Sequence, residues 1–212
     1  MKYSLCSDTD RQDWDRYVHA HGDATACHLF AWRDVVSGVF RQQPHYLAAR
    51  DATGAIRGVL PLVRLRSVLF GDFLVSMPYL NYGGVLADSE AVGEGLVAEA
   101  VTLARTLGVS HMELRYVEPR LPSWPTRTDK VSMRLALQPR ADDFHKALGS
   151  KLRAQIKRPE KGGATCQSAG AALLDDFYAV FAENMRDLGT PVYSKKFFAE
   201  VLAAFPEQAR IF

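Results

Sequence analysis

The sequence is poor in cysteine and has no long apolar run. Its three cysteines in 212 residues, Cys6, Cys27 and Cys166, are widely spaced and predict reduced thiols, not a disulfide framework. No stretch reaches the roughly 18 apolar residues of a membrane-spanning helix. The first residues also lack the apolar core of a signal peptide. We therefore expect a cytoplasmic location and no transmembrane segment.

The chain also lacks a strong excess of charge of either sign. The chain has 26 Lys and Arg against 24 Asp and Glu, for a formal net charge of +2. Any anion-binding role must therefore come from local clustering of cations. With 48% hydrophobic residues, the composition is that of an ordinary globular protein, large enough for one domain and part of another.

Several cofactor and catalytic motifs are missing. The sequence has neither a Gly-x-Ser-x-Gly elbow nor a His-Glu-x-x-His pair. His19, His21, Cys27 and His28 do not have the spacing of zinc ligands. The GEGLVA stretch at 93–98 falls inside a predicted helix instead of directly after a strand, which argues against a dinucleotide site. We expect no metal and no tightly bound cofactor.

Hydrophobic periodicity predicts an α+β fold. Two helices open the chain, and an antiparallel meander, a further helix and more strands follow. The expected helices are 10–20, 29–40 and a third that Asp88 or Ser89 caps and Gly108 ends. The expected strands are 45–50, 56–66, 67–77, 109–117 and 130–138. Gly58 and Pro61 indicate a bulge or a sheet edge in the second strand. This order of elements resembles the acetyltransferase fold of the GNAT superfamily, with a mixed, mostly antiparallel sheet.

The chain then begins a similar series. We expect a basic helix at 141–158, a short strand at 164–168 and helices at 172–187 and 194–205. Residues 32–50 and 197–212 share the order aromatic helix, proline, strand. We therefore predict a first GNAT-like domain at 1–138, and a linker helix with an incomplete second copy at 139–212. The apolar side of helix 194–205 would lack most of the sheet that covers it, which predicts self-association.

The segment KLRAQIKRPEKGG at 151–163 concentrates cations. Five of its thirteen residues are Lys or Arg, and Glu160 is its one acid. Lys151, Arg153, Lys157 and Arg158 either form a solvated helix face or bind a phosphate-bearing substrate. Phe144, Leu148, Leu152 and Ile156 would form the apolar stripe of this helix, and Pro159 should end or kink it.

Two loops carry further candidates. PYLNYGG at 78–84 is either a tight connection or a substrate contact through Tyr79, Asn81, Tyr82 and Gly83. MRDLGTPVYS at 185–194 is either a structural loop or a substrate-lining one. The second loop adds Asp187, Thr190, Tyr193 and Ser194. If the protein transfers an acyl group to an amine, Asp187, Tyr193 and Tyr82 are the candidates for proton handling.

Three segments together resemble the FemAB-like family, in the branch associated with exosortase/PEP-CTERM systems. They are VLPLVRLRSVLFGDFLVSMPYLNYGG, KLRAQIKRPEKGG and MRDLGTPVYSKKFF. The resemblance implies tandem GNAT folds and acyl or aminoacyl transfer to an amine of a cell-envelope or exopolysaccharide-related precursor. It also implies acyl-CoA or aminoacyl-tRNA as the donor. The usual GNAT pyrophosphate motif, Arg/Gln-x-x-Gly-x-Gly/Ala, is absent from loop 78–84, so we do not expect the first copy to hold coenzyme A in the usual way.

A second interpretation belongs to another class of protein. The basic helix could serve a non-catalytic module that binds RNA or an anionic glycan. Single-strand RNA binders usually place aromatic side chains among their cations, and KLRAQIKRPEKGG has none. This favours phosphate contact, including contact with a tRNA backbone, over base stacking.

Overall fold

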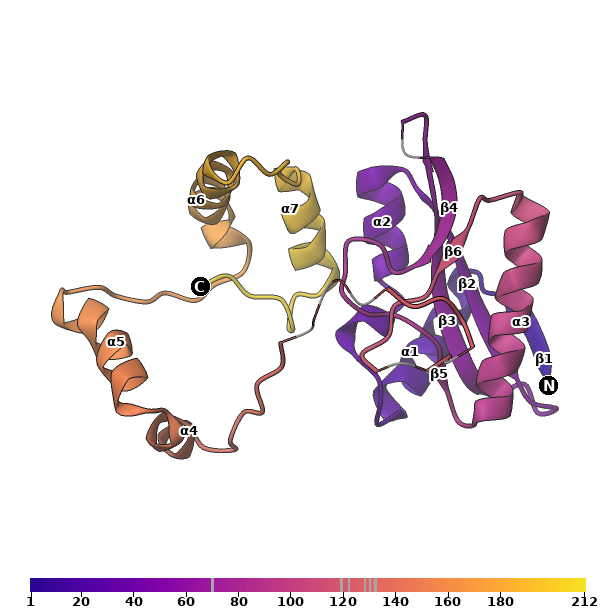
Figure 1. Ribbon diagram of the computed structural model, residues 1–212, viewed down its shortest axis with the longest axis horizontal. Coiled ribbons are helices and arrows are strands. Elements are labelled where there is room, and N and C mark those ends of the chain that lie inside the picture. The colour runs from indigo at the N-terminus through magenta and orange to yellow at the C-terminus, as the bar shows by residue number, and fades with distance from the viewer. Residues whose placement is uncertain (70, 119, 122, 128, 130, 132) are drawn as a thin grey trace. The chain divides into compact units, whose positions relative to one another are not determined.

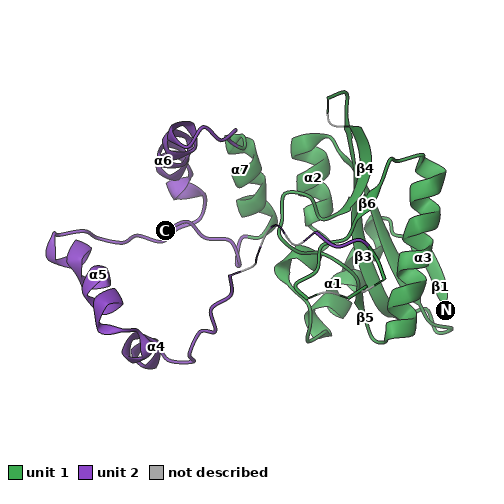
Figure 2. Ribbon diagram, viewed as in Figure 1, with its two compact units in different colours: residues 1–124, 193–205 green, residues 125–192, 206–212 purple. Residues whose placement is uncertain are grey.

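The computed structural model describes residues 1–69, 71–118, 120–121, 123–127, 129, 131 and 133–212. The chain divides into two compact units, which Figure 2 colours separately. Unit 1 comprises residues 1–124 and 193–205, and unit 2 comprises 125–192 and 206–212. The predicted domain boundary at 138 differs from this division, and the second GNAT-like copy stays a prediction.

Unit 1 is built on a mixed, mostly antiparallel sheet, which confirms the predicted α+β class and the predicted type of sheet. The strands run in the order β1-β2-β3-β4-β6, and β5 pairs with β3. Only the β4–β6 pair is parallel. The strands are β1 (Lys2–Leu5), β2 (Gln43–Arg50), β3 (Ile56–Ser67), β4 (Gly71–Ser76), β5 (Leu86–Ala87) and β6 (Met112–Glu113).

Helices cover both faces of this sheet (Figure 1). On one side lie α1 (Arg11–Ala20) and α2 (Trp32–Phe40), and on the other lies α3 (Glu90–Leu107). Because successive side chains of a strand alternate between faces, Tyr46 on β2 stacks on Trp14 of α1, 5.0 Å between ring centroids. Its neighbour Leu47 joins the core against Leu96 of α3. The run 46–49 is therefore buried on both faces.

The predicted boundaries of α3 are confirmed at both ends. The Ser89 hydroxyl accepts a hydrogen bond from the Val92 amide, and Gly108 ends the helix at φ 66°. The bulge prediction is also confirmed, since the β2–β3 register shifts between Ala49 and Arg50. Of the two alternatives predicted for this strand the structure has the bulge, since β3 lies between β2 and β4 and is not an edge.

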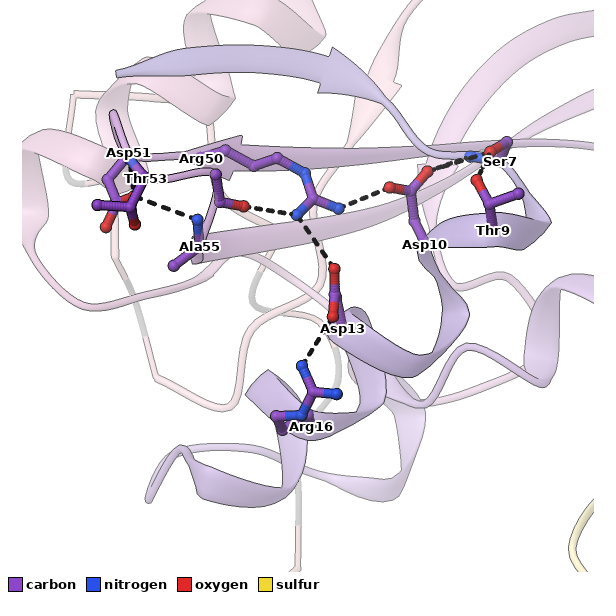
Figure 3. Close-up of polar contacts among 10 residues, drawn as sticks. Ser7, Thr9, Asp10, Asp13, Arg16, Arg50, Asp51, Thr53 and Ala55 are labelled. Carbon is purple, nitrogen blue, oxygen red and sulfur yellow. Dashed lines mark hydrogen bonds and ion pairs between the residues drawn. The ribbon is translucent and has the colours of Figure 1, made fainter.

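A charged network joins the end of β2 to the start of α1 (Figure 3). The Arg50 guanidinium lies 2.6 Å from an Asp10 carboxylate oxygen and 3.6 Å from one of Asp13. Asp10 also accepts a hydrogen bond from the Ser7 amide at 2.8 Å. Burial raises the pKa of Asp10, but the Ser7 hydrogen bonds and the Arg50 charge outweigh it, so the pKa lies below its ordinary value.

Helix α7 (Lys195–Ala204) also belongs to unit 1, where it packs on α2. Phe205 lies 4.9 Å from Trp32 and Phe197 lies 5.4 Å from Phe40, centroid to centroid. Phe197 and Phe205 are consequently buried. Helix α2 thus covers part of the apolar side that was expected to lack a sheet, while Phe198, Val201 and Leu202 stay half-buried. Self-association itself stays a prediction.

The described part of unit 2 is mainly helical. It contains α4 (Ala141–Ala147), α5 (Ser150–Lys161) and α6 (Leu174–Asp187). Ala169 and Ile211 exchange two backbone hydrogen bonds, of 3.0 and 2.8 Å. No helix among the described residues of either unit is long and apolar enough to cross a membrane.

Several strand predictions differ from the structure. The described residues of 130–138, which are 131 and 133–138, form no strand, and neither do 164–168. Residues 70, 130 and 132 of the predicted strands lie outside the described residues. Of 109–117 only Met112–Glu113 pairs, and β1 was not predicted. The predicted third strand begins at Gly71 instead of residue 67, because Ser67 still belongs to β3.

Candidate functional site

The loop between β4 and β5 has an unusual backbone. Met77 and Tyr79 have φ values of 50° and 69°, and Gly83 has φ 134°. Left-handed backbone is uncommon for residues other than glycine and tends to cluster at functional sites. Three such positions in residues 77–84 make this loop the first candidate for a site in unit 1.

Met77 anchors the start of the loop. Its side chain is buried, and the Tyr46 hydroxyl lies 3.3 Å from its sulfur. A Cβ atom at position 83 would lie 2.6 Å from the Met77 side chain, so the loop can fold back over Met77 only with glycine there. Gly83 therefore has a structural role, which is to let the loop pass close to Met77. Its role in substrate contact stays a prediction.

The parallel strands β4 and β6 diverge next to this loop. Their paired residues are Leu74 with Met112 and Val75 with Glu113. Beyond them the Arg115 amide donates to the Ser76 hydroxyl at 2.7 Å, a side-chain bond where the ladder would otherwise continue. The backbone of this segment returns to the loop at Gly84, whose amide donates to the Arg115 carbonyl at 2.8 Å.

Arg115 bridges the two diverging segments. Its Nη1 donates to the Leu80 carbonyl at 2.7 Å, and its Nε donates to Glu113 Oε1 at 2.6 Å. Sequence reasoning missed this residue. The available signal was a pair of opposite charges two positions apart in a predicted strand, which places both side chains on one face.

His28 supports the far end of the loop. Its imidazole is buried, with Nε2 3.1 Å from the Gly84 carbonyl, while Nδ1 accepts from the Thr25 amide at 3.1 Å. These partners require a neutral ring that carries its proton on Nε2. Burial holds the pKa of His28 below its ordinary value.

Tyr79 belongs to an aromatic cluster with Phe40, Tyr193 and Phe197. Its ring stacks on Phe40 with centroids 3.9 Å apart, and Tyr193 meets it edge-on at 6.1 Å. Burial, and then the neighbouring Tyr193, raise the pKa of Tyr79 despite a hydrogen bond with the Gln42 side chain. The structure therefore brings together two of the predicted residues, one from each predicted loop.

The other predicted residues of unit 1 are more dispersed. Asn81 is exposed and Tyr82 is half-buried, both in the same loop. Ser194 is the N-cap residue of α7, and its carbonyl accepts from the Phe197 amide at 2.9 Å.

Asp187 and Thr190 lie in unit 2. Asp187 ends α6, and its carboxylate is exposed and paired with Arg186 at 3.0 Å. The Thr190 backbone amide donates a hydrogen bond to the Met185 carbonyl at 2.9 Å.

The basic segment forms α5, whose cations are largely exposed. Lys151, Lys157 and Arg158 form no ion pair with any described residue. Arg153 differs, because its Nη1 donates to the carbonyls of Lys146 and Leu148 at the end of α4. Its guanidinium thus satisfies carbonyl groups that a helix end leaves without partners.

Helix α5 differs from the predicted helix 141–158 at both of its ends. The helix breaks at Leu148 and Gly149, which separates α4 from α5, and the chain stays helical through Pro159 to Lys161. Leu152 and Ile156 are 45% and 42% exposed, so they do not attach the helix to a core. The cations of α5 project from an exposed helix.

The buried thiol of Cys6 is poorly suited to nucleophilic chemistry. Burial raises the pKa of the Cys6 thiol to about 12, so this thiol is protonated at neutral pH and a poor nucleophile. Among the residues that the structure describes, no group of three or more His, Cys, Asp or Glu side chains is arranged to hold a metal ion.

Comparison with solved structures finds a similar fold in FemX. Its crystal structure matches with a TM-score of 0.67 at 13% identity over 99% of this chain. This chain covers 56% of the length of FemX.

Smaller proteins match only in part. A ribosomal-protein-alanine N-acetyltransferase from Brucella melitensis biovar Abortus 2308 has a TM-score of 0.43 at 13% identity, over 65% of this chain and 100% of its own. An aminoglycoside antibiotic 6'-N-acetyltransferase from Acinetobacter haemolyticus has a TM-score of 0.41 at 13% identity, with the same coverage. No protein-family model matches the sequence, and no curated protein matches it either.

Proposed function

We propose that this chain is part of a Fem-type acyl- or aminoacyl-transferase. The observation that carries the proposal is the likeness to FemX in fold over 99% of the chain. The acceptor would be an amine of a cell-envelope or exopolysaccharide-related precursor, in the exosortase/PEP-CTERM-associated branch. The donor would be aminoacyl-tRNA or acyl-CoA, and the reaction would take place in the cytoplasm.

The reaction sets clear demands on the site. The amine nitrogen attacks the carbonyl carbon of the donor ester or thioester, and the carbonyl oxygen becomes an oxyanion. The nitrogen then loses a proton to a base, and the bond to the tRNA oxygen or coenzyme A sulfur breaks. That leaving group takes a proton as the amide forms. The site thus needs a hydrogen-bond donor for the oxyanion and a path for the proton.

Tyr79 suits the first task. Its raised pKa keeps the phenol protonated at neutral pH, so the hydroxyl can donate a hydrogen bond but is a poor base. The strained loop and the stacking on Phe40 fix the ring before substrate binds. Tyr193, Tyr82 and Asp187 remain the candidates for proton handling.

A transfer assay tests this proposal. Labelled aminoacyl-tRNA and labelled acyl-CoA are each incubated with an amine-bearing envelope precursor, and label in an amide product is counted. Tyr79→Phe should lower the rate about 100- to 1,000-fold, as expected for loss of an oxyanion donor. Tyr178→Phe on α6 removes the same atom as a control and should leave the rate unchanged. Transfer from neither donor with the unaltered protein contradicts the proposal.

A second candidate is a non-catalytic module that binds an anion, either RNA or a glycan. It is favoured by the exposed Lys151, Lys157 and Arg158 of α5, which form no ion pair with described residues. The same surface would hold the phosphates of a transferase substrate, with Arg153 beside it.

Binding measurements with matched variants test the anion surface. Lys157→Ala with Arg158→Ala spares Arg153, which has a structural contact. Each phosphate contact to a charged donor contributes roughly 1.5–3 kcal/mol, so the double variant should bind tRNA at least a hundredfold more weakly. Arg16→Ala with Arg105→Ala removes equal charge from exposed positions of unit 1 and should retain binding. Equal weakening in both variants would mean nonspecific attraction.

A further inference from the structure

The tip of the β3–β4 hairpin exposes two adjacent aliphatic side chains. Val68 and Leu69, called here the hairpin tip, are 105% and 86% exposed. They follow Ser67, the last residue of β3, which pairs with Gly71 at the start of β4. Figure 1 shows the hairpin projecting beyond the end of α2 at the top of the view.

The strands that carry the tip are firmly held. They pair without a break from Leu62 with Ser76 to Ser67 with Gly71. Below the tip, the Arg64 guanidinium binds both carboxylate oxygens of Asp72, at 2.8 and 2.6 Å. Such a bidentate pair is geometrically specific. The paired strands and this ion pair therefore hold the apolar tip out in solvent, away from the core.

Arginines lie on the segments at the base of the tip. Arg66 is the second residue before Val68, and its side chain is 79% exposed and 3.8 Å from Asp72. Its amide donates to the Gln42 side chain at 3.2 Å, which places the exposed Arg41 on the adjoining segment. With Arg64, three arginines and one aspartate give this end of unit 1 a local charge of +2.

We propose that the hairpin tip is a membrane anchor that inserts into the interface of an anionic phospholipid bilayer. Val68 and Leu69 would enter the boundary between headgroups and acyl chains, while Arg41 and Arg66 contact the headgroup phosphates. The anchor is an interaction beyond the proposed transfer activity, and it does not depend on that activity.

The size of the tip favours a bilayer over a protein partner. A stable protein interface buries about 800 Å² on each partner, which two aliphatic side chains cannot provide. A bilayer needs no complementary pocket, and a few apolar residues with nearby cations suffice for reversible binding. Gln42 links the tip to the candidate loop, because it also hydrogen-bonds Tyr79. Docking would thus bring Tyr79 toward the membrane surface.

Co-sedimentation with phospholipid vesicles tests the anchor. The protein should bind vesicles of phosphatidylcholine with 30% phosphatidylglycerol more tightly than vesicles of phosphatidylcholine alone. Val68→Ser with Leu69→Ser should lower binding to the anionic vesicles at least tenfold. Val131→Ser with Leu135→Ser makes the same chemical change at exposed residues of unit 2 and should not lower it. Arg66→Ala should reduce the preference for phosphatidylglycerol.

A fluorescence measurement separates insertion from surface adsorption. The fluorescence emission of the Leu69→Trp variant should shift to shorter wavelength with anionic vesicles and be quenched by brominated lipid. The emission of the Leu135→Trp variant should show neither change. Three results would overturn the proposal: no binding to anionic vesicles, equal binding by the tip variant, or an unquenched tryptophan at position 69. A tip variant that instead alters the sedimentation coefficient without lipid would assign the tip to contact between copies.

Discussion

Arg115 donates a hydrogen bond from its guanidinium to the carbonyl of Leu80, with 2.7 Å between nitrogen and oxygen. The bond joins the segment after β6 to the middle of the strained loop that follows β4. It lies just past the last paired residues of the two strands, where backbone pairing no longer holds them. The shape of the candidate loop therefore depends on a side chain from a distant part of the sequence.

Replacing Arg115 should destabilise unit 1 and loosen the loop. Arg115→Ala removes charge-assisted bonds to Leu80 and Glu113 and leaves a half-buried carbonyl without its partner. We expect a loss of about 2 kcal/mol in the free energy of unfolding, measured by urea titration. Arg120→Ala breaks an exposed pair with Asp23 and should cost under about 0.5 kcal/mol. Equal losses in the two variants would show that the Leu80 contact contributes nothing special.

A side chain at position 84 should destabilise the protein. A Cβ atom there would lie 2.5 Å from the Tyr116 ring and 2.9 Å from the Arg115 carbonyl oxygen. Because one of these neighbours is backbone, the clash cannot be relieved by a change of rotamer alone. Gly84→Ala should cost about 1–3 kcal/mol, read as a lower midpoint of thermal unfolding. Gly22→Ala, where a Cβ atom would have no neighbour within 4 Å, should leave the midpoint nearly unchanged.

Gly95 differs because its obstacle is a side chain. The Tyr3 hydroxyl of β1 would lie 1.9 Å from a Cβ atom at position 95 of α3. Gly95→Ala should therefore destabilise the protein by about 1–3 kcal/mol. In a Tyr3→Ala background the same change should stabilise it by about 0.5–1 kcal/mol, since alanine favours helix over glycine.

A double-mutant cycle in urea measures this reversal. Gly93→Ala, whose Cβ atom would meet Val85 at an ordinary 3.5 Å, should be mildly stabilising in either background. If Gly95→Ala has the same effect with and without the Tyr3 ring, the proposed clash is absent.

The central sheet and α3 could be predicted because their signals are local. The Ser89 cap and the Gly108 stop are properties of single residues, and the buried run around Tyr46 reflects a strand covered on both faces. The arrangement of the loop could not be predicted in this way. Arg115 is 35 positions from Leu80, and no periodicity reports such a contact.

Many of the candidate residues were predicted from two loops of the sequence, and the structure brings two of them, Tyr79 and Tyr193, together. Tyr79 and Tyr193 come from segments far apart in sequence and meet in one cluster because α7 packs on α2. The same packing gives α7 a partial cover from a helix, where the sequence predicted that a covering sheet would be missing. The basic helix was misjudged for a different reason. Its apolar spacing is regular, but the Leu148–Gly149 break interrupts the stripe and no core lies beneath Leu152 or Ile156.

Stability should fall as the pH drops from 7.5 to 5.5, chiefly through His28 and His45. Burial holds the pKa of both rings below the ordinary 6.5 in the folded protein. Below pH 6.5 the unfolded chain therefore binds protons that the folded chain does not, and unfolding becomes more favourable. Each ring contributes at most about 1.4 kcal/mol per pH unit. The contribution of Asp10, whose folded pKa is lowered, is lost only at more acidic pH.

Part of the pH slope should come from the hydrogen bond between the Thr25 amide and His28. Protonated His28 could no longer accept from the Thr25 amide, although Nε2 could still donate to Gly84. His28→Gln should therefore flatten the dependence of the free energy of unfolding on pH between 7.5 and 5.5, measured by urea titration at several pH values. His19→Gln, at an exposed position of α1, should leave the slope as it is. A slope that survives His28→Gln unchanged would place the pH sensitivity at His45, whose Nε2 is buried without a hydrogen-bond partner among the described residues.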